Sequence, residues 1–103
     1  MKLSRRKAAT PPQATYRRVQ LEFVDPNARM VHVAGTFNDW NQTAIEMVPM
    51  GAGRWWKELM LPPGEHQYRF VVDGVWVDDP AAAEYLDNGV GSRNALIRVA
   101  PFV

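Results

Sequence analysis

The sequence contains a series of short runs in which apolar and polar residues alternate, broken by glycine, proline, asparagine or aspartate. Alternation with a period of two is typical of strands that bury one face. Turn-forming residues at such short intervals leave little room for helices. The pattern predicts an all-β sandwich of antiparallel strands. Its strands are expected over 16–24, 29–34, 54–61, 65–72, 75–78 and 95–99, with a short strand near 44–47 and one helical turn over 80–85.

Length and composition limit this sandwich to a single small domain. A chain of 103 residues builds one hydrophobic core and has no room for a second catalytic lobe. We expect the sandwich over 16–103 and a disordered arm over 1–15, which carries four basic residues and a Pro-Pro pair.

Charge and apolar patterning exclude several partners. The net charge of +1 gives no field that would attract nucleic acid. No apolar stretch is long enough to span a membrane, and no secretory signal follows the basic arm, so a cytoplasmic protein is expected. The absence of cysteine excludes disulfides and thiolate chemistry.

The stretch GEHQYRFVVDGVW predicts a β-hairpin of defined register. Asp73-Gly74 between two apolar runs favours a two-residue type I′ turn. The predicted cross-strand pairs are then Val72–Val75, Val71–Trp76, Phe70–Val77 and Arg69–Asp78. Paired residues share a face, so the core face comprises His66, Tyr68, Phe70, Val72, Val75 and Val77. A shift of one residue would bury Arg69, so this register is strongly favoured.

The same register places Trp76 on the polar face of the sheet, beside Arg69. A tryptophan there would leave a large apolar area in water. Either another strand or loop covers it, or it is a platform for a ligand. The residues of the hairpin leave both interpretations open.

Two longer motifs carry a family resemblance. They are VAGTFNDW at 33–40 and LPPGEHQYRFVVDGVW at 61–76, followed by Asp79-Pro80. In this order and spacing they resemble the family 48 carbohydrate-binding modules, above all those that bind glycogen. The resemblance covers about residues 16–100. It implies an immunoglobulin-like "early set" sandwich that binds α-1,4-linked glucans without catalysis and without a cofactor.

The resemblance also implies a set of carbohydrate-binding residues. Two tryptophans that stack on sugars fall on Trp40 and Trp76, and a lysine that reaches sugar hydroxyls is replaced by Arg69. An inserted leucine and a hydrogen-bonding asparagine fall on Val90 and Asn94. Arg69 keeps the charge but presents its donors as a planar fork. Val90 is shorter than leucine, and the loop before Asn94 is one residue longer than in the family.

Other aromatic residues have structural explanations. Trp55 and Trp56 are neighbours on one strand, so they face opposite sides, and Trp55 is assigned to the core. Trp56 is a surface aromatic or covers a sheet edge, with a sugar contact as the alternative. Phe37 is predicted to anchor the core.

The histidine and aspartate residues do not indicate a metal site or a catalytic site. His32 is expected in solvent and His66 at the core edge, and the two lack metal-ligand spacing. Asp78 and Asp79 are adjacent on an extended segment and should diverge, which makes them a poor acid–base pair. The chain contains no catalytic motif, so we expect no enzyme activity.

Two hypotheses follow from these observations. The first is a non-catalytic module that binds α-glucan, such as glycogen or maltooligosaccharides, and docks a glycogen-metabolising enzyme or kinase onto it. The second is a protein-interaction or scaffold domain of the same fold, in which the aromatics meet a partner chain. The presence of both tryptophans with a basic residue favours the first.

Overall fold

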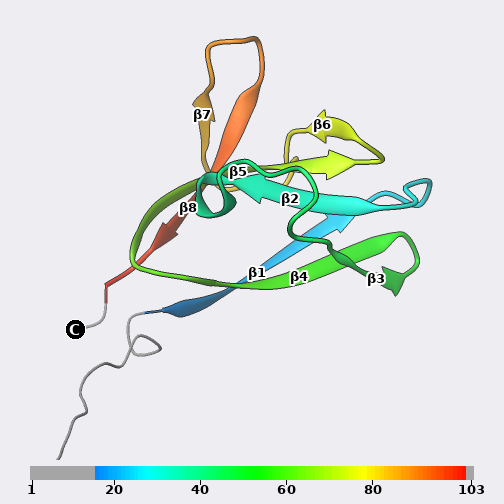
Figure 1. Ribbon diagram of the computed structural model, residues 1–103, viewed down its shortest axis with the longest axis horizontal. Helices are drawn as coiled ribbons and strands as arrows, with labels where there is room; N and C mark the ends of the chain where they lie inside the picture. The colour runs from blue at the N-terminus through cyan, green and yellow to red at the C-terminus, as the bar shows by residue number, and fades with distance from the viewer. Residues whose placement is uncertain (1–15, 102–103) are drawn as a thin grey trace, which may run out of the picture.

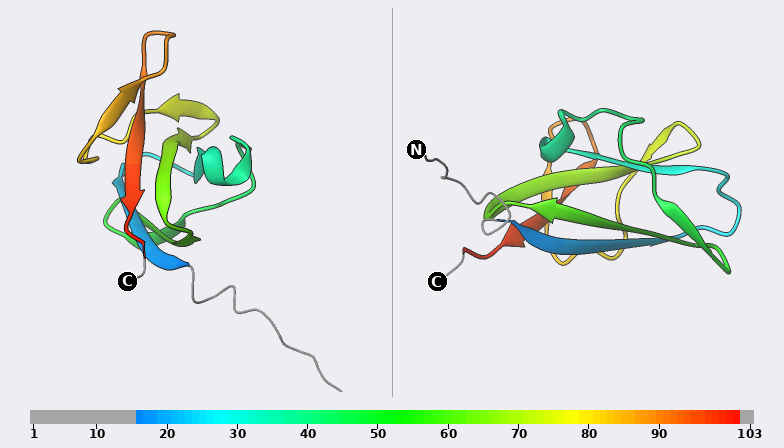
Figure 2. Two further views of the ribbon diagram at one scale, coloured as in Figure 1. Left: turned by 90° about the vertical axis from the view of Figure 1, so that its left-hand side faces the viewer. Right: turned by 60° about the horizontal axis from the view of Figure 1, so that its bottom comes forward.

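The computed structural model describes residues 16–101, and these form two antiparallel sheets packed as a sandwich (Figures 1 and 2). The predicted all-β fold class is therefore confirmed. The elements are β1 (Arg17–Val24), β2 (Val31–Gly35), the 3₁₀ turn η2 (Thr36–Asn38), β3 (Val48–Gly51), β4 (Arg54–Leu61), β5 (Gly64–Val72), β6 (Val75–Val77), β7 (Tyr85–Asp87) and β8 (Arg93–Val99).

The larger sheet is organised around β5. The smaller sheet has the order β1-β4-β3, and the larger has the order β2-β5-β8-β7 with β6 also paired to β5. β2 takes one edge of β5, whereas β8 pairs with Gly64–Tyr68 and β6 pairs with Phe70–Val72 along the other edge. Arg69 is thus the residue at which β5 passes from one neighbour to the next.

The core lies between the two sheets and is dominated by aromatic side chains. Phe70 is completely buried, and its ring centroid lies 4.8 Å from that of Phe23 and 5.7 Å from that of Tyr68. Trp55 is buried as predicted, and Phe37 packs against the core, also as predicted. Aromatic pairs at these distances stabilise the fold beyond the effect of the apolar area that they bury. This cluster is therefore a main source of stability.

The hairpin has the predicted register. Val72 pairs with Val75, Val71 with Trp76 and Phe70 with Val77. Asp73 and Gly74 both have positive φ angles, 49° and 84°, as a type I′ turn requires. One detail was wrong: Val75 is 63% exposed, because it lies at the hairpin tip, beyond the packed part of the sandwich.

Three other predictions need correction. The helical turn over 80–85 is absent: Tyr85 begins β7, and Glu84 accepts a bond from the Leu96 amide, so pairing with β8 overrides the helix preference of alanine. Near 44–47 only Glu46 forms a bridge, to His32, and the strand comes later as β3. β8 also begins at Arg93 rather than at 95. The predicted arm over 1–15 lies outside the described residues.

Asp79 joins the sandwich to the segment that leads to β7. Its side chain is 5% exposed, accepts a hydrogen bond from the Tyr68 hydroxyl and accepts another from the Ala81 amide. Asp78 instead pairs with Arg69, so the two aspartates diverge as predicted. Among residues 16–101 no helix is long and apolar enough to cross a membrane.

Burial, reinforced by the hydrogen bond to Asp79, raises the pKa of the Tyr68 hydroxyl far above its ordinary value near 10. Above about pH 10 the unfolded chain loses this proton while the folded chain keeps it. The folded state is then disfavoured as pH rises. We expect the melting temperature to fall above about pH 10, and to fall less steeply in Tyr68→Phe. Thermal melts at a series of alkaline pH values measure this.

The matched control for that experiment is Tyr16→Phe, because Tyr16 is 41% exposed. Its melting temperature should follow the wild-type dependence on pH. If the melting temperatures of wild type and Tyr68→Phe fell equally steeply with pH above about pH 10, the role assigned to Tyr68 would be contradicted.

Candidate functional site

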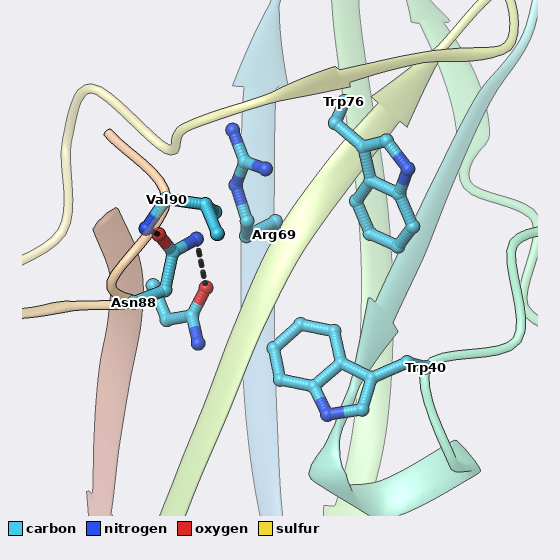
Figure 3. A pocket seen from close by; sticks show the side chains of 6 residues that line it. Trp40, Arg69, Trp76, Asn88 and Val90 are labelled. Atoms are coloured by element: carbon cyan, nitrogen blue, oxygen red, sulfur yellow. Dashed lines mark hydrogen bonds between the residues drawn. The ribbon is translucent and has the colours of Figure 1, made fainter. Parts of the chain in front are cut away.

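One hollow on the outer face of the larger sheet brings together all five residues predicted as the site. It has a volume of about 400 Å³ and is lined by Trp40, Arg69, Trp76, Asn88, Val90 and Asn94. Figure 3 shows the side chain of Arg69 between Trp76 and Val90, with Trp40 facing it from the loop after β2. The sixth lining residue, Asn88, was not predicted.

Trp40 reaches the hollow through an unusual backbone turn. Asp39 and Trp40 both have positive φ angles, 56° and 57°, which is uncommon for residues other than glycine. The side chain of Asn38 stabilises the turn: its oxygen accepts a bond from the Gly35 amide at 2.9 Å. The Trp40 amide in turn donates to the Gly35 carbonyl at 2.9 Å. The turn therefore fixes the point from which Trp40 projects.

Trp76 projects from β6 and meets Trp40 at an angle. Their ring centroids are 6.3 Å apart, and the ring planes are tilted by 56°. Both side chains are only partly buried. Trp56 lies on β4 in the other sheet, opposite Glu22, and is not among the residues that line the hollow. The two tryptophans of the hollow thus form a pair of inclined apolar surfaces.

Arg69 is held by an ion pair within the protein. Its Nε and Nη2 atoms lie 3.1 and 2.7 Å from the same oxygen of Asp78. Its Cζ atom lies 5.8 Å from the centroid of the Trp76 ring. The family resemblance implies that Arg69 offers a fork of donors to a ligand, whereas two of its N–H groups already bind Asp78. The side chain is only 14% exposed.

A series of hydrogen-bonded side-chain amides forms the wall of the hollow that lies across from the two tryptophans. Asn94 donates to Gln67 at 3.0 Å and accepts from Asn88 at 3.3 Å. Asn88 also donates to the Ser92 hydroxyl at 2.7 Å and accepts from the Val90 amide at 3.2 Å. Asn88 therefore positions both Asn94 and the loop that carries Val90. In the sequence Asn88 is followed by Gly89, a pair typical of turns, and nothing in the local pattern indicates this contribution.

Val90 is 81% exposed on this loop. We expect Asn88→Ala to free the loop and to weaken binding of the α-glucan that the family resemblance implies by about three- to tenfold, the scale of one or two hydrogen bonds. Folding should change little, because the loop lies outside the core. Calorimetric titration with maltoheptaose, beside a thermal melt, measures both effects. Unchanged affinity would contradict the role of Asn88.

The described residues contain no cluster of side chains that could bind a metal ion. No group of three or more histidine, aspartate or glutamate side chains within residues 16–101 has the arrangement of a metal site. A second hollow of about 390 Å³ is lined by residues 44–49 and Lys57, none of which is aromatic. The first hollow combines flat apolar rings with amide donors and acceptors. Such a surface matches a pyranose, which has an apolar C–H face and a rim of hydroxyls.

Comparison with known proteins identifies the family. Residues 18–102 match the family model described as the glycogen recognition site of AMP-activated protein kinase. Over 69 residues, or 67% of the chain, the sequence is 41% identical to 5'-AMP-activated protein kinase subunit beta-2 of mouse and of human. It is 35% identical to subunit beta-1 of pig over the same length.

The matched region is 24% of the beta-2 subunits and 53% of the pig beta-1 sequence, so the chain spans about a quarter of the length of the beta-2 relatives. The family match, by contrast, extends over most of the chain. The chain therefore belongs to the family of non-catalytic carbohydrate-binding modules described as the glycogen recognition site of AMP-activated protein kinase.

Proposed function

We propose that this chain binds α-1,4-linked glucan, such as glycogen, starch or maltooligosaccharides, by stacking Trp40 and Trp76 on sugar rings. The observation that carries the proposal is the convergence of these two indoles, 6.3 Å apart, on one hollow. Each indole covers the apolar face of a pyranose, and the amides and the arginine beside them meet its hydroxyls.

The angle between the indoles favours an α-linked chain. Successive glucose units of an α-1,4 glucan turn relative to one another, so the chain curves. Two platforms inclined by 56° follow such a curve, whereas a flat β-1,4 chain fits coplanar platforms. The preferred ligand is therefore an α-1,4 glucan of several units.

The polar wall and Val90 complete the proposed site. Asn94 uses one side-chain N–H for Gln67 and one lone pair of its oxygen for Asn88. Its second N–H and second lone pair bind sugar hydroxyls. Val90, on its exposed loop, inserts beside the bound chain. A shallow site with so few anchors binds in the micromolar to millimolar range.

We also propose that binding brings a partner, such as a glycogen-metabolising enzyme or a kinase, to glycogen. The names of the relatives support this, since they are subunits of 5'-AMP-activated protein kinase. The cytoplasmic location expected from the sequence stays a prediction.

Electrophoresis in native gels cast with and without glycogen tests the function. Glycogen should retard wild type and Trp56→Ala, and should not retard Trp40→Ala/Trp76→Ala. Trp56 is the matched control because it is a partly buried tryptophan on the other sheet. Equal mobility of wild type in both gels would contradict glucan binding. If wild type then recovered a stoichiometric partner without glycogen, the scaffold hypothesis would replace it.

A further inference from the structure

A partly buried cation lies in a site for which we have proposed an uncharged ligand. The Arg69 side chain is 14% exposed and lies beside the ring of Trp76. A guanidinium in such a place needs a counter-charge, because its removal from water is costly unless it is paired. A glucan has no charge to offer. The counter-charge must therefore come from the protein.

Asp78 is the residue that supplies this charge. It directly follows β6, two residues after Trp76, so the carboxylate and the indole lie on one short segment of the chain. Arg69 stands on β5 at the point between the pairing segments of β8 and β6. The β5–β6 ladder ends at the pair of Phe70 and Val77. The ion pair thus joins β5 to the segment just beyond that ladder.

From this geometry we infer that Asp78 is a positioning residue of the glucan site. Two N–H groups of Arg69 bind one oxygen of Asp78, which fixes the plane of the guanidinium. The guanidinium carbon lies 5.8 Å from the Trp76 ring centroid, within the range of a cation–π contact. This attraction favours one orientation of the ring. Asp78 therefore acts through Arg69 to set the angle at which Trp76 meets Trp40.

The pair has a second consequence for the ligand. The other oxygen of Asp78 and the remaining nitrogen of Arg69 have no hydrogen-bond partner within residues 16–101. The opposite charges of Arg69 and Asp78 offset each other within the pair. This inference rests on the proposed function, because it concerns how the same hollow selects an uncharged glucan.

The first test needs no ligand. Two close, non-parallel indoles couple to give a paired signal in the far-ultraviolet circular dichroism, and its intensity depends on their angle. We expect this signal in wild type, its loss in Trp40→Ala, and a clear reduction in Asp78→Asn. Glu22→Gln is the matched control, because it removes the carboxylate of an exposed arginine pair on the other sheet. It should keep the signal.

The second test is calorimetric titration with maltoheptaose. Asp78→Asn should weaken binding by about five- to tenfold, the scale of one lost charge-assisted contact, while Glu22→Gln binds as wild type does. Asp78→Glu should recover part of the loss. Arg69→Met/Asp78→Asn should bind no more weakly than Arg69→Met, since Asp78 acts through Arg69.

Two results would overturn the inference. One is an unchanged dichroism signal and affinity in Asp78→Asn. The other is a double variant whose loss equals the sum of the two single losses, because Asp78 would then act independently of Arg69. Failure of wild type to bind maltoheptaose would instead reject the proposed function, and the ligand-free dichroism would still decide the role of Asp78.

Discussion

Replacing both Trp40 and Trp76 with alanine is expected to weaken maltoheptaose binding by about 100-fold or more. Each stacked aromatic contributes about 1–3 kcal/mol by truncation, and each 1.4 kcal/mol changes affinity tenfold. The loss is expected to be large because the hollow offers few other apolar contacts. Calorimetry suits this measurement, since the variant lacks two of the four tryptophans that fluorescence would report.

The folded state should survive this double substitution. Both side chains are only partly buried and lie outside the core cluster. A melting temperature close to that of wild type would attribute the lost affinity to the site. Trp56→Ala should bind as wild type does. Equal losses in Trp56→Ala and the double variant would contradict the assignment of the site to this hollow.

Gly35→Ala is expected to destabilise the protein by about 3 kcal/mol, the upper range for forcing atoms into a packed region. A Cβ atom at Gly35 would lie 2.3 Å from the carbonyl oxygen of Gln67 and 2.7 Å from the Phe37 ring. The carbonyl belongs to the backbone of β5 and cannot move aside as a flexible side chain would. The turn that supports Trp40 must then shift. Denaturant unfolding measures the stability, and maltoheptaose titration measures the consequence for the site.

Gly51→Ala is the control that separates the steric clash at Gly35 from the general effect of adding a side chain to a glycine. Gly51 has a φ angle of 90° and open space around its Cβ position. Its replacement by alanine should therefore lower the free energy of unfolding by about 1 kcal/mol, through backbone strain alone. Gly35 has an extended φ angle of −165°, which any residue adopts. A Gly35→Ala loss no greater than that of Gly51→Ala would contradict the steric explanation.

The hairpin and its exposed tryptophan follow from the residues alone. The Asp73-Gly74 turn fixes the register, and the register fixes the face on which Trp76 lies. A shift of one residue would turn Arg69 toward the apolar core, so local chemistry leaves little choice of register. This part of the site was predictable because its residues are close in sequence and paired on neighbouring strands.

The position of Trp40 relative to Trp76 does not follow from local pattern. It depends on two successive residues with positive φ angles and on the hydrogen bonds of Asn38, which periodicity does not reveal. Only the family resemblance suggested that both tryptophans serve one site. The hollow brings them together.

The missed features depend on contacts between distant parts of the chain. The alanines of 81–83 favour a helix locally, yet hydrogen bonding to Asp79 and the approach to β8 keep that segment extended or turned. The role of Asn88 could not be predicted from the sequence, because its bonds to Asn94 and Ser92 arise only when the loop before β8 folds. The predicted register placed Arg69 opposite Asp78, but it did not reveal that an ion pair between them uses two of the N–H donors of Arg69.

A nuclear magnetic resonance titration of the ¹⁵N-labelled chain with maltoheptaose tests glucan binding residue by residue. The side-chain N–H signals of Trp40 and Trp76 and the amide signals of Val90 and Asn94 should shift most, and those of Trp55 and Trp56 should not. Absence of any shift, or shifts concentrated at the second hollow of residues 44–49 and Lys57, would contradict it.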